Sequence, residues 1–264
     1  MNLSQPLPPE FGEALARAAD RLGAFAREIV WYADVSSTND EAAALAEGGA
    51  AEGTVVAAYA QSAGRGRQGR VWASPAGAGL YVSTVLRPPP DAVSMLTIAA
   101  GVAVAEGVQA AAGLRVDLKW PNDVYVGPRK LAGVLAEASA VRDIQYVILG
   151  FGINVMPAAY PPEIAARATS LEAELGRPVD RGLLLAECLA ALARRYGDLR
   201  DGRGDVVCGV WRMRAAASLG RRVRWAAPGA PIDGTADDID ATGALIVRTD
   251  AGTIRVTSGE VVWM

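Results

Sequence analysis

Residues 115–151, RVDLKWPNDVYVGPRKLAGVLAEASAVRDIQYVILGF, alternate short apolar runs with turn-forming residues. Strands are predicted at 115–120, 123–127, 131–139 and 144–151, because Val, Ile, Leu and Tyr gather there between Pro, Asn, Asp and Gly. The links between these segments are too short for helical crossovers, so neighbouring strands should run antiparallel. The stretch therefore predicts a sheet of adjacent antiparallel strands.

Further helices and strands flank this block on both sides. Helices are predicted at 10–29, 36–49, 92–112, 162–174, 181–200 and 205–218, and strands at 29–35, 54–60 and 80–88. Thr38 and Glu41 have the spacing of a capping box at the start of the second helix. Together these elements predict an α+β or mixed α/β domain over residues 1–218, in which residues 1–29 form an N-terminal helical extension.

The composition changes after Gly220. About five short alternating strands follow, separated by Pro-Gly, Asp-Gly, Thr-Gly and Ala-Gly turns. This pattern is typical of a small all-β domain and differs from the helix-rich sequence before it. We therefore predict a small β-barrel over residues 219–264, appended to the larger domain.

Composition excludes several classes of function. The 264 residues carry a net charge of −3, so the chain has no overall basic field of the kind that drives non-specific nucleic-acid binding. Histidine is absent, which excludes histidine metal sites, Ser-His-Asp triads and histidine general bases. Cys188 and Cys208 lie far in sequence from any second cysteine or histidine cluster. Both are therefore predicted to be reduced packing residues of a cytoplasmic protein.

No targeting or membrane-spanning segment is predicted. Residues 1–20 contain prolines and then an amphipathic pattern, without the basic and apolar regions of a signal peptide. Each apolar stretch is interrupted by Arg, Asp, Glu or Pro before it reaches membrane-spanning length. The expected protein is cytoplasmic and makes no membrane contact.

The segment Gly64–Arg70, GRGRQGR, is the most unusual loop of the chain. It satisfies GxGxxG, but VWASPAGAG follows it and cannot open the helix that a dinucleotide-binding turn requires. Three arginines among glycines can offer bidentate donors to phosphate or carboxylate groups. A solvated basic loop and an RNA-contacting loop are the alternatives, and the loop alone does not decide between them.

Three other polar segments are candidates for a site. Both lysines of the chain, Lys119 and Lys130, flank the turn WPND, whose Asn and Asp are also ordinary turn residues. The segment SSTN at 36–39 offers donors and acceptors for an uncharged polar ring, although helix capping is its simpler role. The segment GFGINV at 150–155 ends a strand and is otherwise explained as a bulge or turn.

SSTN, GRGRQGR with a following Trp, KWPND, RKLAGVL and GFGIN occur in an order and spacing that resembles bacterial biotin–protein ligases, that is, biotin–[acetyl-CoA-carboxylase] ligases. The resemblance runs from about residue 30 to the C-terminus. It implies a catalytic domain like that of class II aminoacyl-tRNA synthetases, with a mixed sheet flanked by helices, followed by an SH3-like barrel. It also implies that the enzyme activates biotin with MgATP to biotinyl-5′-AMP, releases pyrophosphate, and transfers biotin to a lysine of a biotin carboxyl carrier domain of acetyl-CoA carboxylase or a related carboxylase.

The resemblance also implies roles for individual residues. Those expected to bind biotin or the nucleotide are Ser37, Thr38, Asn39, Gln61, Arg65, Gly66, Arg67, Trp72, Lys119, Asn122, Lys130, Gly133 and Asn154. The first four would meet the ureido end of biotin, the arginine loop would close over biotin and the adenylate, Trp72 would cover the adenine and Asn154 would contact the nucleotide. Catalysis is assigned to Lys130, Arg67, Lys119 and Asp123, the last as a base or orienting group in the transfer step. The metal ligands are not identified by the sequence.

Two rival functions remain at this point: a lipoate–protein ligase or transferase of the same broad fold, and a non-catalytic nucleic-acid-binding module. Some family members carry an N-terminal winged helix-turn-helix of about sixty residues that represses biotin genes. Here about 29 residues precede the first predicted strand, so we expect a short form without DNA binding or repressor activity. The expected assembly is a monomer or homodimer.

Overall fold

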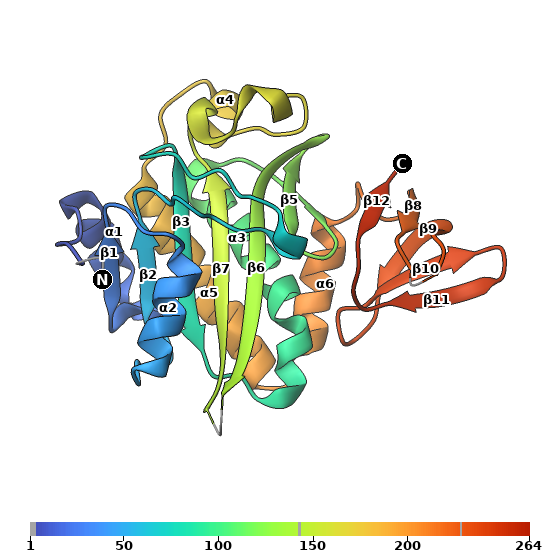
Figure 1. Cartoon of the computed structure of the whole chain (residues 1–264), viewed down its shortest axis with the longest axis horizontal. Coiled ribbons are helices and arrows are strands. Elements are labelled where there is room, and N and C mark those ends of the chain that lie inside the picture. The colour runs from blue at the N-terminus through green and yellow to red at the C-terminus, as the bar shows by residue number, and fades with distance from the viewer. Residues whose placement is uncertain (1–3, 142–143, 228) are drawn as a thin grey trace.

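The computed structural model describes residues 4–141, 144–227 and 229–264, and two β-sheets organise them. The larger sheet has seven strands in the order β1-β2-β3-β7-β6-β5-β4 (Figure 1). Its strands are β1 (Ile29–Tyr32), β2 (Val55–Ala58), β3 (Gly79–Leu86), β4 (Asp117–Lys119), β5 (Asp123–Val126), β6 (Arg129–Val141) and β7 (Ile144–Asn154). The β1–β2 pair is parallel and the other recorded pairs are antiparallel, which makes the sheet mixed. The antiparallel arrangement predicted for residues 115–151 is confirmed.

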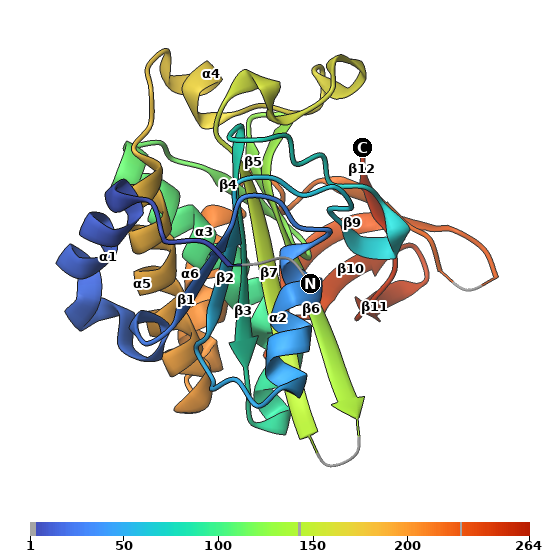
Figure 2. The same ribbon diagram turned by 60° about the vertical axis from the view of Figure 1, so that its left-hand side comes forward.

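Helices cover both faces of this sheet. They are α1 (Pro9–Leu22), α2 (Thr38–Glu47), α3 (Leu96–Ala112), α4 (Leu171–Leu175), α5 (Arg181–Arg200) and α6 (Gly204–Arg214). Figure 2 shows α1, α3, α5 and α6 on one side of the sheet and α2 on the other. The face under α3 and α5 carries most of the buried apolar side chains, whereas α2 covers a smaller cluster around Val35 and Val56. The predicted mixed sheet flanked by helices is confirmed.

Several predicted helices are shorter than expected, and the one predicted at 205–218 ends at Arg214. The first ends at Leu22, because Gly23 leaves the helical region with φ 55°, and a 3-10 turn follows. The helix predicted at 162–174 was wrong: it is replaced by a 3-10 turn at Pro162–Ile164, an extended stretch, and α4. The extended stretch pairs with β6, since Lys130 N donates to Arg167 O and Lys130 O accepts from Thr169 N. Pairing with a distant strand therefore overrides the local helical pattern.

The region Pro90–Ala112 corrects the membrane prediction. Its 3-10 turn and α3 together are long and apolar enough to cross a membrane, by length and composition. However, 72% of its apolar window is buried inside the fold. The helix packs between the sheet and α5, which is the environment of a core helix.

Residues after α6 form the second sheet, in the order β11-β10-β9-β8-β12. Its strands are β8 (Arg222–Trp225), β9 (Ile232–Ile239), β10 (Leu245–Thr249), β11 (Gly252–Val256) and β12 (Val261–Trp263). The recorded pairs are all antiparallel, as a small barrel-like domain requires. The indole of Trp120 donates to Gly243 O at 2.8 Å and joins this C-terminal domain to the larger one. The two sheets fall on either side of the boundary predicted at residues 218–219.

Both cysteines are buried and unbonded, as predicted for packing residues. Cys188 lies in α5 against Gly107 of α3, where a Cβ at position 107 would lie 2.5 Å from the Cys188 sulfur. Glycine at position 107 therefore lets the two helices approach closely. Burial raises the pKa of the Cys188 thiol, which keeps it in the unreactive protonated form.

Candidate active site

A cavity of about 540 Å³ lies between α2, the loop after β2, the strands β5 to β7 and the C-terminal strand β12. Every site residue predicted from the sequence lines it: Ser37, Thr38, Asn39, Gln61, Arg65, Gly66, Arg67, Trp72, Lys119, Asn122, Asp123, Lys130, Gly133 and Asn154. These positions are spread over 118 residue numbers of sequence, from 37 to 154, and the fold brings them to one place. The structure thus groups the predicted residues, and their individual roles stay predictions.

Unsatisfied polar atoms mark the same cavity. Among the residues that the structure describes, three buried side-chain atoms lack a hydrogen-bond partner, namely Trp72 Nε1, Asp123 Oδ1 and Trp263 Nε1. All three residues line the cavity. Asp123 Oδ1 does lie 2.6 Å from Lys130 Nζ, so it has an ionic partner without a well-directed hydrogen bond. Because proteins rarely bury polar groups without partners, these atoms indicate a place where a ligand completes the bonding.

Polar side chains without a charge, from Ser37 to Asn39 and at Gln61, line one end of the cavity. Gln61 Oε1 accepts from Thr38 N at 2.8 Å and from Thr38 Oγ1 at 3.1 Å, while Gln61 Nε2 donates to Ser74 Oγ at 2.8 Å. The hydroxyl of Ser83, which is fully buried in β3, lies 2.7 Å from Thr38 Oγ1 and 2.5 Å from Asn39 Oδ1. This network fixes the orientation of each amide and hydroxyl, so the end is preorganised for an uncharged polar group.

The predicted capping box is wrong. Ser37, not Thr38, occupies the N-cap of α2, and no side chain caps the helix there. Thr38 instead directs its hydroxyl to Gln61 across 23 residues of sequence. A partner supplied by the tertiary fold has replaced the local one, and the helix N-terminus faces the cavity.

Side chains that pack against residues 150–152 account for the glycines of the segment GFG. A Cβ at Gly150 would collide with Asn39 Oδ1, and a Cβ at Gly152 would lie 2.5 Å from Trp72 Nε1. Position 133 on the neighbouring strand is also crowded, since a Cβ there would lie 3.2 Å from the Trp72 ring. The strand β7 keeps regular pairing with β3 and β6 through this segment, so the predicted bulge or turn was wrong. The glycines leave space for the Asn39 and Trp72 side chains, which pack on this strand and line the cavity.

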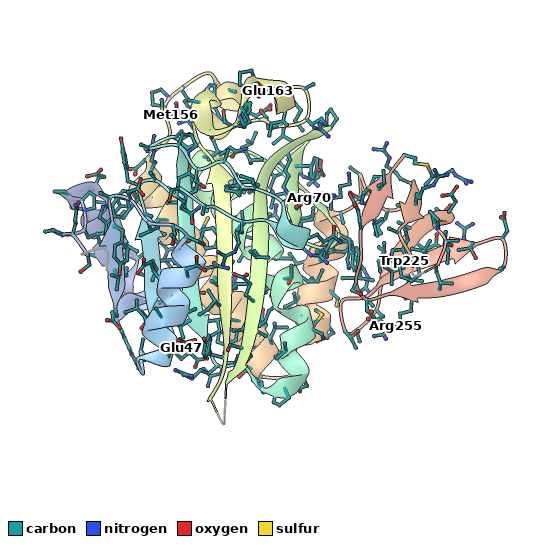
Figure 3. All side chains as sticks on the ribbon, viewed as in Figure 1. Glu47, Arg70, Met156, Glu163, Trp225 and Arg255 are labelled. Carbon is teal, nitrogen blue, oxygen red and sulfur yellow. The ribbon has the colours of Figure 1, made fainter. Side chains whose placement is uncertain are left out.

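Carboxylates hold both ends of the arginine loop. Arg65 contacts Asp40 at 2.6 Å and Glu137 at 3.3 Å, and the strong pairing raises the pKa of its guanidinium. Arg70 forms an ion pair with Glu260 of the C-terminal domain. Figure 3 shows Arg70 on the side of the larger domain that faces that sheet.

Arg67 stands between these two anchors. Within the described part of the chain it has no salt bridge, and burial lowers the pKa of its guanidinium although Asp123 opposes the shift. A desolvated guanidinium without a bound carboxylate attracts an anionic ligand strongly. Arg67 is therefore the loop arginine best placed to bind the charged part of a ligand.

The two lysines have different environments. Lys130 Nζ lies 2.6 Å from Asp123 Oδ1 and 5.3 Å from the centre of the Trp72 ring. Lys119 Nζ lies 4.8 Å from the centre of the Tyr125 ring and 5.5 Å from that of Trp263. Burial lowers the pKa of Lys119, partly offset by the charge of Asp123. Together with Arg67 these amines make one end of the cavity cationic.

Two asparagines at the site are tied to backbone. Asn122 Nδ2 donates to Val134 O at 2.7 Å, and the buried Asn154 Nδ2 donates to Thr169 O at 2.9 Å. The second bond anchors the extended stretch that pairs with β6 and carries Arg167 to the cavity. Asn154 therefore has a structural task here, and its contact with the nucleotide stays a prediction.

Two family models match the chain. The one described as "Biotin/lipoate A/B protein ligase family" matches residues 31–154, and the one described as "Biotin protein ligase C terminal domain" matches residues 218–264. The biotin--[acetyl-CoA-carboxylase] ligase of Mycobacterium tuberculosis is 37% identical over 245 residues, covering 89% of each chain. The chain belongs to the biotin protein ligase family.

Other comparisons agree with this membership. The biotin protein ligase from Aquifex aeolicus in complex with biotin and ATP matches with a TM-score of 0.79 and 30% identity, over 90% of this chain and 99% of that one. The bifunctional ligase/repressor BirA of Bacillus subtilis is 34% identical over 259 residues, which cover 96% of this chain and 79% of the relative. The predicted resemblance is confirmed, and this biotin protein ligase is an enzyme. The lipoate and nucleic-acid-module alternatives were wrong, since the matching relatives and structures are biotin ligases.

Several residues of the biotin protein ligase site were missed by the sequence analysis. They are Ser83, Tyr125, Glu137, Arg167, Glu260 and Trp263. Ser83 lies inside a strand pattern, where a polar residue at a fully buried position is the signal that could have found it. Glu137 lies two residues after the RKLAGVL motif. Arg167 fell in the wrongly predicted helix. Trp263 carries no local signal, because the distance that matters joins it to a residue 144 positions earlier.

Proposed function

We propose that this biotin protein ligase joins the biotin carboxylate to the α-phosphorus of ATP and then passes the biotinyl group to a lysine of a carrier domain. One cavity with an uncharged polar end and a cationic end carries this proposal. Biotin offers an uncharged ureido ring at one end and a carboxylate at the other, and ATP adds phosphates beside that carboxylate. The chemistry of the two ends therefore matches the two ends of the cavity.

In the first step a carboxylate oxygen of biotin forms a bond to the α-phosphorus, and the bond from that phosphorus to the bridging oxygen breaks, so pyrophosphate leaves. The nucleophile is already ionised at neutral pH, so no general base is needed and the lack of histidine is no obstacle. Arg67, Lys119 and Lys130 would hold the two anions together and stabilise charge on the phosphoryl oxygens.

In the second step a carrier lysine attacks the acyl carbon, an amide bond forms and AMP leaves. The amine must lose a proton in this step. Asp123 lies in the cavity with its carboxylate paired to Lys130, which fixes its position. We propose that Asp123 orients Lys130 in the first step and accepts or relays the amine proton in the second.

Magnesium fits this site as a companion of the nucleotide. Among the described residues, no group of three or more His, Cys, Asp or Glu side chains could hold a metal ion alone. A nucleotide-bound Mg²⁺ needs less, because one or two carboxylates complete a shell made mostly of phosphate oxygens and waters. The Asp123 carboxylate, with Asn122 beside it, would supply such a ligand. When bound, the ion would offset negative charge on the phosphates.

Incubation with biotin, MgATP and a biotin carboxyl carrier domain tests the function, read by streptavidin blot. We expect labelling of the carrier that depends on both biotin and ATP. A carrier whose target lysine is replaced by arginine is the matched control and should stay unlabelled. Lack of transfer by the folded protein would contradict the proposal, and which carboxylase supplies the natural carrier would follow from comparing candidate carriers.

We also propose that residues 4–264 act without DNA-binding repression, unlike the relative named as a bifunctional ligase/repressor. Within the described residues, the segment before β1 is a helix packed on α5 and not a helix-turn-helix. In a gel-shift assay with a biotin-operon promoter fragment, no specific biotin-dependent band is expected. Such a band would refute the proposal. The cytoplasmic location and the oligomeric state stay predictions.

The pH dependence should report on Lys119. Burial lowers the pKa of this amine. As the pH rises, Lys119 therefore loses its positive charge earlier than an ordinary lysine does. We expect kcat/KM for ATP to fall as the pH rises through this range. Tyr125 does not confuse the profile, since burial raises its pKa to about 12. In Lys119→Arg the alkaline fall should move to higher pH; superimposable alkaline limbs would rule out this role.

A further inference from the structure

The last strand of the chain reaches into the nucleotide end of the cavity. Glu260 and Trp263 both line it, although they belong to the C-terminal domain. The Trp263 ring lies 5.5 Å from Lys119 Nζ, and Tyr125 lies 4.8 Å from the same nitrogen. Lys119 thus contacts two aromatic rings, one from each domain.

We infer that Trp263 is a positioning and binding residue of the nucleotide end: its ring holds the Lys119 ammonium in place, and its indole N–H donates to an oxygen of the bound nucleotide. The inference deepens the proposed function and rests on it. It assigns to the C-terminal domain a direct share in the ATP site through one named side chain.

The first part of the inference follows from the environment of Lys119. Within the described chain this lysine has no carboxylate in ion-pair contact, in contrast to Lys130. A desolvated ammonium without a carboxylate is stabilised by the electron-rich faces of aromatic rings. The rings also limit the positions of a long, flexible side chain, so the charge stays where an incoming phosphate can meet it.

The second part follows from the indole nitrogen. Trp263 Nε1 is buried and has no partner, and an indole N–H can only donate. Other tryptophans near the domain junction use theirs: Trp120 Nε1 donates to Gly243 O, and Trp225 Nε1 donates to Ser258 O. Figure 3 shows Trp225 within the C-terminal sheet. In the proposed complex an oxygen of the bound nucleotide would supply the acceptor that Trp263 lacks, because Trp263 lines the cavity beside Lys119.

A second contact supports the same arrangement. Arg70 of the arginine loop is paired with Glu260, which lies three residues before Trp263. The end of the chain is thereby fixed against the loop that lines the cavity. The C-terminal domain consequently holds Trp263 at the site from two directions, through the loop and through the pairing of β12 with β8.

Two substitutions in the full chain separate the two tasks of Trp263. Trp263→Phe keeps an aromatic ring and removes the N–H, and we expect the KM for ATP to rise about 10-fold. Trp263→Leu removes both, and the KM for ATP should rise about 30-fold or more. The KM for biotin should stay within about 2-fold of wild type in both variants. Met264→Ala, at the exposed neighbouring residue that does not line the cavity, is the matched control and should leave both KM values unchanged.

Calorimetric titration with ATP alone keeps this inference distinct from the proposed function. Weaker ATP binding in the order wild type, Phe variant, Leu variant supports it. Unchanged ATP binding by the Leu variant overturns it, whatever happens to biotin activation. Equal rises in the KM values for ATP and biotin also overturn it, because they would indicate general loosening of the domain contact. Absence of biotin-dependent pyrophosphate exchange in the wild-type protein would instead refute the proposed function.

Discussion

Lys130→Ala is expected to lower the rate of biotin-dependent pyrophosphate exchange about 100- to 1,000-fold. The Lys130 ammonium lies between the Asp123 carboxylate and the Trp72 ring, in the cavity that would hold the biotin carboxylate and the α-phosphate. Removing this charge leaves two mutually repelling anions with less compensation as the new bond forms. It also leaves Asp123 without its ionic partner, which adds to the repulsion.

Arg129→Ala is the matched control for this substitution. Arg129 is the preceding residue, pairs with Glu174 and does not line the cavity, so exchange should stay close to the wild-type rate. Single-turnover formation of biotinyl-5′-AMP gives the direct measurement. A Lys130→Ala variant that is folded and forms the adenylate within about 3-fold of the wild-type rate would remove Lys130 from the reaction centre.

Gly150→Ala and Gly152→Ala should impair different substrates. A methyl at position 150 would collide with the Asn39 amide at the polar end, so we expect the KM for biotin to rise. A methyl at position 152 would displace the Trp72 indole, so the KM for ATP should rise instead. Overpacking costs about 1–3 kcal/mol, which corresponds to about 5- to 150-fold in KM if the strain falls on the binding site.

Steady-state kinetics with each substrate varied in turn will show whether the two effects separate. Gly197→Ala is a suitable control, because a Cβ at this helical position has no neighbour within 4 Å. The thermal unfolding of each variant must be followed in parallel, since a strained β7 also lowers stability. If both glycine variants raise the two KM values by the same factor, the assignment of the cavity ends is wrong.

Local patterns predicted most of the fold. The hairpins of residues 115–151 arise from turns and neighbouring strands, so the information lies within a few residues. The failures have a common cause. Residues 167–169 are extended because they pair with Lys130, and the Thr38 hydroxyl bonds to Gln61 and does not cap the helix. In each case a partner far along the chain outweighs a modest local preference.

The sequence also predicted most of the candidate site. The residues carried by the motifs converge on one cavity, because the motifs are short and the residues within each stay close in any fold. The residues that complete the cavity between motifs were missed. Trp263 reaches it only through the packing of the C-terminal domain, and no short pattern around this residue indicates a ligand.

Because both lysines lie in a single cavity, reagents that react with side-chain amines should modify this protein only there. An activated ester or a lysine-directed cross-linker will find no other side-chain amine on the chain, so its reaction with Lys119 or Lys130 reports directly on access to the cavity. Occupancy by ligand should then appear as protection of two peptides in a mass spectrum. The same feature means that coupling the protein to a support through its lysine side chains would block the cavity, whereas coupling through surface carboxylates would leave it open.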